Sequence, residues 1–97
     1  MIRTYGLTHV ALAVRDVERA FRFYQEVFGV VQVYRRDGFL QAQTPGSRDV
    51  LVFKVDPERA GRSGGVAHLG FRLLDPADID AAAEAVRRAG GVIVGAG

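Results

Sequence analysis

The sequence predicts an α+β fold built from two copies of one strand–helix unit, and three observations predict it. A run of β-forming residues precedes an amphipathic helix at two places in the chain. His9 and His68 hold the same position within these two runs, 59 residues apart (68 − 9 = 59). Asp16 and Asp75 also coincide, each just before a helix. A period of this length indicates a duplicated supersecondary unit.

The composition is that of one ordinary globular domain, which we expect to cover residues 1–97. The sequence has 48% hydrophobic and 25% charged residues, a formal net charge of +2 and no cysteine. The lack of cysteine excludes disulfides and thiolate metal ligands. The charges are interspersed, so we expect no nucleic acid as a partner. No apolar run reaches the roughly 18–20 residues of a membrane span and no signal-peptide pattern is present, so we expect a cytoplasmic protein with no membrane partner.

The first unit, about residues 6–55, begins with a strand and a helix. Residues 7–14 are rich in branched apolar side chains and predict a strand. Asp16 is a candidate N-cap of the helix, and Gly29 is the residue that ends it. Between them, apolar residues recur at the i, i+3, i+4, i+7 spacing of one helix face. Those positions are Val17, Ala20, Phe21, Tyr24, Val27 and Phe28.

Three further strands are expected to complete the first unit, at 30–36, 39–43 and 49–55. The first two are joined by Asp37-Gly38, a dipeptide strongly favoured in two-residue hairpin turns. The next connection, residues 44–47, has the loop sequence Thr-Pro-Gly-Ser.

A linker separates the two units. Residues 56–65 contain three glycines and a proline and hold no extended apolar run, so they predict a loop. The second unit then begins with a strand over 66–74. This unit, residues 66–97, is shorter than the first, so we expect it to lack its last strands. The chain is then a fragment of a longer protein, or its site is incomplete.

The helix of the second unit has clear start and stop signals. Asp75 is the candidate N-cap, and Pro76 stands at the first helical position, where its missing N–H has no cost. We expect the helix to end near Ala89, because Gly90-Gly91 follows. A further strand is expected to begin over 92–94.

Alternation along the two repeated strands separates bulky from small side chains. The bulky residues of each strand share one face, which we expect to pack on the helices. The opposite faces carry His9 and His68 among mostly small residues, so we expect both histidines to point into one concavity. The bulky residues are Val10, Leu12 and Val14 in the first strand and Leu69, Phe71 and Leu73 in the second.

The run THVALAVRDVERAFRFYQEVFGV, residues 8–30, closely resembles the opening of the vicinal oxygen chelate superfamily. That superfamily includes glyoxalase I, bleomycin-resistance proteins and extradiol dioxygenases. Residues 65–91, GVAHLGFRLLDPADIDAAAEAVRRAGG, resemble the opening of its second module. The resemblance extends over residues 6–97. It implies paired βαβββ modules that form a cupped mixed sheet around a ligand, with the second module incomplete at the C-terminus.

The resemblance also implies a divalent metal ion (Fe, Mn, Zn, Ni or Co) held by His9, His68 and a carboxylate expected beyond Gly97. The ion would act as a Lewis acid in a lyase, isomerase, dioxygenase or transferase reaction on a small oxygenated molecule. Glyoxalase I-like members draw a further Glu from the last strand of the first unit. Residues 49–55 contain none, and only Asp49 at their edge could replace it, so glyoxalase I itself is disfavoured.

Other interpretations of the same residues stay open. Each histidine could be an ordinary strand residue with a hydrogen-bond partner, and the protein could be a metal-free, antibiotic-sequestering member of the bleomycin-resistance type. Arg72 is a candidate for binding a ligand carboxylate or phosphate. Gln41 and Phe53 are further candidate substrate-binding residues, with solvent-exposed and core roles as their alternatives. A homodimer is expected, because a short chain with exposed strand edges needs them covered.

Overall fold

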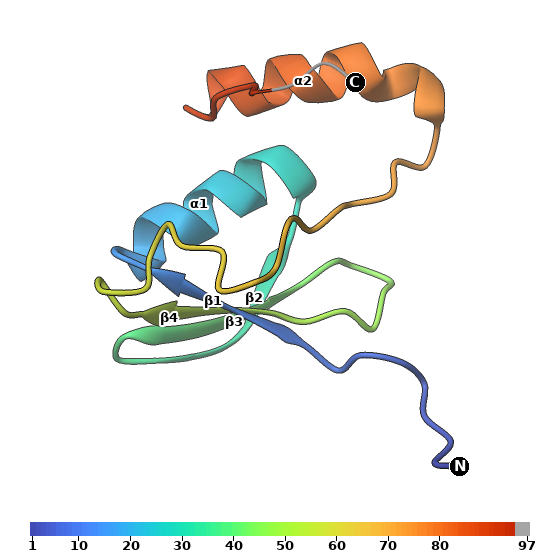
Figure 1. Cartoon of the computed structure of the whole chain (residues 1–97). Helices are drawn as coiled ribbons and strands as arrows, with labels where there is room; N and C mark the ends of the chain where they lie inside the picture. Colours follow the sequence, from blue (N-terminus) through green and yellow to red (C-terminus); the bar gives the residue numbers. More distant parts are fainter. Residues whose placement is uncertain (95–97) are drawn as a thin grey trace.

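The structure, a computed structural model, describes residues 1–94, and its first part is a βαβββ unit (Figure 1). β1 (Val10–Val14) leads into α1 (Val17–Phe28), and three strands follow. These strands are β2 (Val31–Arg36), β3 (Phe39–Gln43) and β4 (Leu51–Val55). All five elements predicted for the first unit are confirmed, although β1, β2 and β4 begin one to three residues later than predicted.

The ends of α1 are set by the two residues that the sequence indicates. Asp16 has the extended backbone of an N-cap, and its Oδ1 accepts a hydrogen bond of 3.1 Å from the Arg19 N–H. Gly29 ends the helix with φ +69°, in the left-handed region that favours glycine. Its N–H donates to the carbonyl of Gln25 at 2.9 Å. These local caps explain why the helix could be placed from the sequence.

The strands form one mixed sheet in the order β1-β4-β3-β2. β1 and β4 are parallel, with Val10 opposite Leu51 and Val14 opposite Val55. The pairs β2–β3 and β3–β4 are antiparallel. A parallel pair needs a long crossover, which α1 and the β2–β3 hairpin provide. The hairpin turns at Asp37-Gly38, as predicted, and the α+β class is confirmed.

The hydrophobic core lies between α1 and one face of the sheet. Tyr24 of α1 meets Phe53 of β4 with ring centroids 5.2 Å apart. Full burial of a phenylalanine side chain contributes roughly 1.5–3 kcal/mol to the stability of the fold. Because β1 contributes Leu12 and Val14 to this packing, its bulky face lies toward the helix, as predicted. The buried core residues are Phe21, Val30, Leu40, Ala42, Leu51 and Phe53.

The predicted helix of the second unit is confirmed. A short 3₁₀ turn, η1 (Pro76–Asp78), precedes α2 (Ile79–Arg88). Asp75 caps this start, because its Oδ1 accepts a hydrogen bond of 2.9 Å from the Ala77 N–H. The N–H of Ala89 closes the helix onto the carbonyl of Ala85 at 3.1 Å.

The two strands predicted for the second unit, at 66–74 and 92–94, are wrong: neither segment is a strand in the structure. The repeat gives the physical reason. In the first unit β1 pairs with β4, residues 51–55. The 59-residue offset puts the equivalents of these partners at 110–114 (51 + 59 and 55 + 59), beyond residue 97. An extended segment with no partner for its N–H and C=O groups does not form a ladder.

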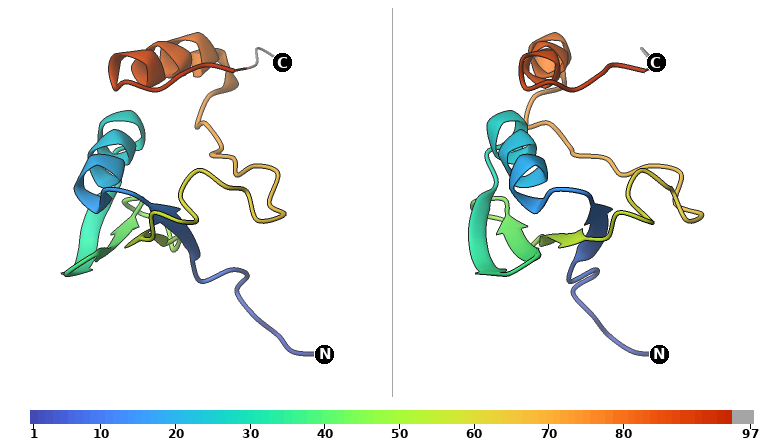
Figure 2. Two further views of the ribbon diagram at one scale, coloured as in Figure 1. Left: turned by 60° about the vertical axis from the view of Figure 1, so that its left-hand side comes forward. Right: turned by 90° about the vertical axis from the view of Figure 1, so that its left-hand side faces the viewer.

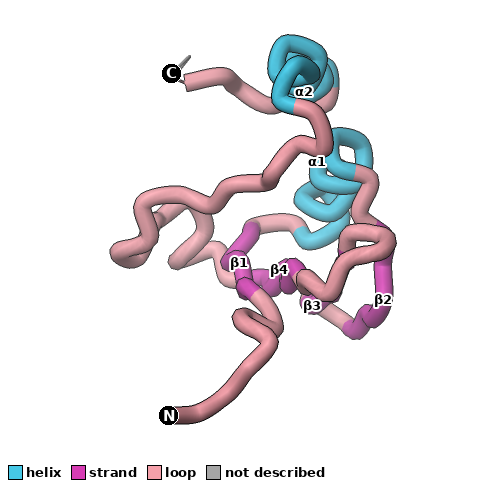
Figure 3. Tube along the Cα trace, turned by 90° about the vertical axis from the view of Figure 1, so that its right-hand side faces the viewer, coloured by secondary structure: helices cyan, strands magenta, loops and turns pink. Residues whose placement is uncertain are grey.

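The elements form three layers: α1 lies between the sheet and α2 in the views of Figures 2 and 3. The long connection over residues 56–75 runs beside the sheet before it reaches α2. No residue of α2 is buried, whereas α1 buries Phe21. Among residues 1–94, no helix is long and apolar enough to cross a lipid bilayer.

Candidate functional site

A cavity of about 470 Å³ lies at the N-terminal ends of the parallel strands β1 and β4. Three segments line it: residues 7–10, the β3–β4 connection with the start of β4, and residues 69–72 of the long connection. The lining combines apolar side chains with hydroxyl groups, a carboxylate, an imidazole and a guanidinium. Such a mixture of apolar surface and a few polar groups is typical of small-molecule sites.

His9 and Arg72, two of the predicted site residues, both line this cavity. His9 is exposed and precedes the first residue of β1. Its Nδ1 is 3.1 Å from the Thr8 hydroxyl oxygen, a hydrogen-bond contact that leaves Nε2 available for another partner. His68 is also exposed but is absent from the cavity lining. The structure therefore brings together His9 and Arg72, and it does not bring His68 to them.

The segment that carries Arg72 is held to the first unit by an aromatic contact. Phe71 stacks on Phe28, the last residue of α1, with ring centroids 4.0 Å apart and ring planes 12° apart. Such stacked pairs contribute about 0.5–1.5 kcal/mol beyond the burial of their area. Phe71 was predicted to face the helices, and this contact joins residues 69–72, which line the cavity, to α1.

Gln41 and Phe53 lie on opposite faces of the sheet and neither lines the cavity. Gln41 is half-buried and stands opposite Val52 in the β3–β4 pair. Phe53 is 0% exposed and belongs to the core beneath α1. This burial favours the core role, the alternative given for Phe53 in the sequence analysis. Alternation along β4 could not separate these roles, since both sheet faces near Phe53 carry apolar residues.

Asp49 makes a contact that the sequence did not indicate. Its Oδ1 accepts a hydrogen bond of 2.9 Å from the Thr44 N–H, and its Oδ2 accepts one of 2.8 Å from the Thr44 hydroxyl. Both residues line the cavity. The only signal in the sequence is an acidic residue that follows the polar loop 44–47 closely. The carboxylate is therefore already engaged where a fourth metal ligand was considered.

A metal ion in a protein is held by several ligand side chains that lie close together. Within residues 1–94, no three His, Cys, Asp or Glu side chains gather closely enough to hold a metal ion. His9 offers one imidazole, His68 lies outside the cavity lining, and Asp49 is bonded to Thr44. The described part of the chain therefore does not fit a complete metal centre.

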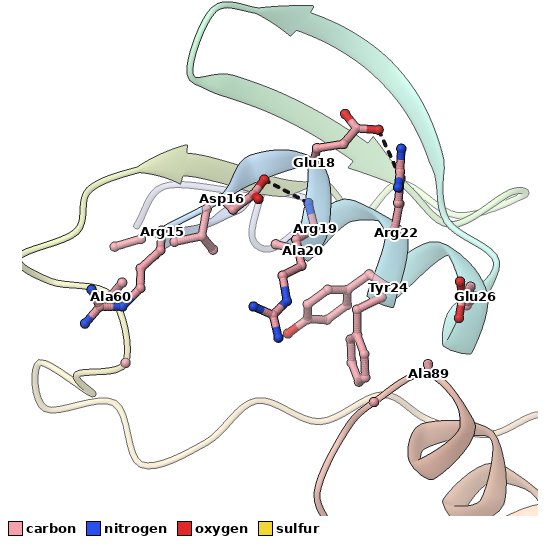
Figure 4. A pocket seen from close by; sticks show the side chains of 15 residues that line it. Arg15, Asp16, Glu18, Arg19, Ala20, Arg22, Tyr24, Glu26, Ala60 and Ala89 are labelled. Carbon is pink, nitrogen blue, oxygen red and sulfur yellow. Dashed lines mark hydrogen bonds and ion pairs between the residues drawn. The ribbon is translucent and has the colours of Figure 1, made fainter.

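A larger cavity, of about 710 Å³, lies between α1, residues 60–61 and the end of α2 (Figure 4). Glu18 pairs there with Arg22 (Nε to Oε1, 3.4 Å) and also with Arg35 of β2. The hydrogen bond from Arg35 holds the pKa of Glu18 below its ordinary value. Three arginines and three acidic residues line this cavity, so it has no excess charge to select an ionic ligand.

The fold is of the α+β class, with one βαβββ unit followed by a second helix among residues 1–94. The family model of the Glyoxalase/Bleomycin resistance protein/Dioxygenase superfamily matches residues 6–96 of this chain. The chain belongs to that superfamily, which confirms the resemblance seen in its sequence.

One related sequence and two solved structures illustrate the similarity. The chain is 31% identical over 91 residues to the uncharacterized protein PA2024 of Pseudomonas aeruginosa, a match that covers 87% of this chain and 65% of that protein. The chain thus spans just under two thirds of the length of this relative.

The structure of a possible glyoxalase from Bacillus cereus superimposes with a TM-score of 0.74 at 22% identity, covering 90% of this chain and 76% of that one. A mutant of the fosfomycin resistance protein FosX from Listeria monocytogenes gives a TM-score of 0.75 at 17% identity, covering 91% and 67%. That protein is complexed with Mn(II) and 1S,2S-dihydroxypropylphosphonic acid. At these identities the similarity shows a shared fold.

Proposed function

We propose that this chain supplies a binding site for a small oxygenated molecule that carries an anionic oxygen group. The observation that supports this proposal is the cavity at the start of β1, whose lining includes both Arg72 and His9. A guanidinium matches the two oxygens of a carboxylate, phosphate or phosphonate in a bidentate pair. An imidazole N–H can donate a further hydrogen bond to the same group.

The rest of the lining suits the non-ionic part of such a molecule. Leu7, Leu69 and Phe71 offer apolar surface, and the hydroxyl groups of Thr44 and Ser47 can bind ligand oxygens. A ligand with an oxyanion at one end and a compact apolar part at the other would match both kinds of lining. Phenylphosphonate is a simple probe with these two features.

Titration of the protein with phenylphosphonate, followed by amide chemical shifts in NMR spectra, tests the proposal. Shifts should concentrate at residues 7–10, 44–51 and 69–72. Arg72→Ala should weaken binding by about tenfold or more, the effect of losing a hydrogen bond to a charged group. Arg72→Lys should retain only part of the affinity, because an ammonium group lacks the planar fork. Arg88→Ala, an exposed arginine of α2 outside the cavity, is the matched control. Equal effects of Arg72→Ala and Arg88→Ala would contradict the proposal.

The second candidate is a divalent-metal-dependent enzyme of the same superfamily. Two observations favour it: the Nε2 of His9 is available at the cavity, and FosX, similar in fold, is complexed with Mn(II). Because residues 1–94 hold no group of three ligands, further ligands would have to come from outside the described part of the chain. His68 is the residue that the repeat puts forward as the second ligand.

Metal analysis separates the two candidates. The protein is incubated with Mn, Fe, Zn, Ni or Co, freed of excess metal, and its bound metal is measured by mass spectrometry. A stoichiometric metal that is lost in both His9→Ala and His68→Ala supports the enzyme. No retained metal in any of the five preparations would contradict it and favour the metal-free binding protein.

We further propose that the protein forms a homodimer. Several large apolar side chains of the second unit are exposed, and exposed apolar surface on this scale is a common feature of interfaces. Light scattering at micromolar concentration should give twice the chain mass, and a monomer would contradict the proposal. The exposed residues are Val66, Leu69, Leu74, Ile79 and Val92.

A further inference from the structure

The connection between β3 and β4 forms one wall of the cavity and is folded around a single carboxylate. Asp49 accepts hydrogen bonds from both donors of Thr44: the backbone N–H at 2.9 Å and the hydroxyl at 2.8 Å. The Ser47 N–H donates to the Thr44 carbonyl at 3.0 Å, and the Ser47 hydroxyl accepts from the Asp49 N–H at 3.2 Å. These four contacts join the two ends of the connection.

We propose that Asp49 is a positioning residue that keeps this wall in its binding conformation. Thr44, Ser47 and Asp49 all line the cavity, so the same side chains that close the connection also face the ligand space. The inference rests on the proposed function, and it assigns to Asp49 a role through Thr44 and Ser47. Asp49 then acts by ordering the wall and is not itself a ligand of a metal ion.

The chemistry of the contact favours a carboxylate. Thr44 presents two donors to Asp49, and only an ionised carboxylate offers two acceptor oxygens to meet them. An asparagine in the same place has one acceptor oxygen, and its amide nitrogen could only donate to the Thr44 hydroxyl, so that contact would reverse direction and lose its charge. Bonds to a charged group are also stronger than neutral ones, and Thr44 and Asp49 are only partly exposed, so water competes less.

An ordered wall favours binding because its conformational entropy is lost during folding. A connection that is free before binding must be ordered when the ligand arrives, and this cost weakens the affinity. The connection contains Gly46 with φ +81°, a conformation open chiefly to glycine, and no regular secondary structure. Without the Asp49 contacts, little in the local backbone would hold it.

Two variants, separately and together, test the inference. Asp49→Asn keeps the size of the side chain and removes one acceptor, and Thr44→Val removes the hydroxyl donor. The double variant then shows whether the two residues act through each other. Thr44→Ser keeps the hydroxyl, so its amide exchange rates and affinity should match those of the unaltered protein. Asp37→Asn, at the exposed hairpin turn, is the matched control, because that aspartate lies outside the cavity lining.

The first readout is amide hydrogen exchange, which needs no ligand. Exchange at the Thr44 and Asp49 amides should accelerate by about tenfold in Asp49→Asn, the change expected from one lost charge-assisted hydrogen bond. The control should leave these rates unchanged. Unchanged rates in Asp49→Asn, or equal acceleration in Asp37→Asn, would overturn the inference.

The second readout is the affinity for phenylphosphonate, measured by NMR titration. Asp49→Asn and Thr44→Val should each weaken binding, and their effects should be less than additive in the double variant. If the unaltered protein binds no phenylphosphonate, the proposed function fails, while the exchange rates still decide whether Asp49 orders the wall. Accelerated exchange with unchanged affinity in a protein that binds the probe would overturn the positioning role.

Discussion

β1 in the first unit and residues 66–74 in the second take the same place in the repeat, and they differ in what lies beside them. β1 pairs along its length with β4, from Val10–Leu51 to Val14–Val55. Residues 66–74 have a similar apolar sequence, and their counterpart of β4 would lie beyond residue 97. The comparison shows that β propensity describes a side chain's fit to a sheet, and a strand forms only where a partner strand exists.

The two helices continue the contrast. α1 covers a sheet and contributes Phe21 to the core, whereas α2 has the same amphipathic pattern and buries no residue. Asp16 caps α1, and Asp75 caps the 3₁₀ turn η1 that leads into α2. Helix formation is therefore local in both units, while core formation depends on a sheet that only the first unit has among residues 1–94.

The largest difference between the units should appear when a core side chain is removed. Phe53 is 0% exposed, and Phe53→Ala should lower the free energy of unfolding by about 3–5 kcal/mol because it leaves a cavity. Val86→Ala in α2 should cost roughly 0.5 kcal/mol or less, since that side chain is only half-buried. Urea denaturation measures both.

The milder variant Leu51→Val serves as a control if Phe53→Ala does not fold. It should still cost more than Val86→Ala, because Leu51 belongs to the same core. Similar losses of unfolding free energy for the first-unit and second-unit variants would mean that both units contain cores that contribute equally to stability.

A smaller difference is expected at the helix caps. Asp16→Ala removes the acceptor for the Arg19 N–H and should lower the free energy of unfolding by about 1 kcal/mol. Asp75→Ala removes the acceptor for the Ala77 N–H, and its effect should be confined to fraying of α2. Denaturation followed by circular dichroism, together with residue-level amide exchange, distinguishes a global from a local loss. A global loss of stability in Asp75→Ala would show that the two units unfold as one cooperative structure.

The smallest effect is a dependence on alkaline pH that arises at Tyr24 of α1. Burial against the core raises the pKa of Tyr24 above its ordinary value of 10.0. The folded state therefore favours the neutral phenol. The contribution of this burial to the free energy of unfolding is complete below pH 10.0 and is lost as the pH rises through the raised pKa of the folded state.

Tyr24→Phe should remove this loss. The melting temperature should fall less between neutral pH and a pH above 10 in Tyr24→Phe than in the unaltered protein. The matched variant Tyr34→Phe should not differ from the unaltered protein, because Tyr34 is exposed. Equal falls in all three proteins would show that burial of Tyr24 does not control this pH dependence.

Local signals were sufficient for α1, the hairpin turn and the cap of the second helix. Strand ends were less predictable, because they depend on a partner. Residues 7–9 continue the apolar run, but β4 begins only at Leu51, so the first ladder bond joins the Val10 N–H to the Val50 carbonyl at 3.0 Å. His9 is thereby left outside the strand.

The candidate site divides in the same way. Family resemblance and strand position drew attention to His9 and Arg72, which line one cavity. The core position of Phe53 and the bonds between Asp49 and Thr44 depend on contacts between segments, and no pattern within a segment reports them. The sequence placed His68 and His9 in one concavity, but that placement depends on a strand over residues 66–74, which the structure does not form.

The parallel pairing of β1 with β4 also has a consequence during synthesis on the ribosome. β1 emerges first but has no partner until Leu51–Val55 follows, so the sheet cannot close in the order in which its strands appear. α1 and the β2–β3 hairpin can form meanwhile, because their contacts are local in sequence. Once Val55 has left the exit tunnel, every strand of the sheet is available. The N-terminal half can then fold while the remainder of the chain is still being translated.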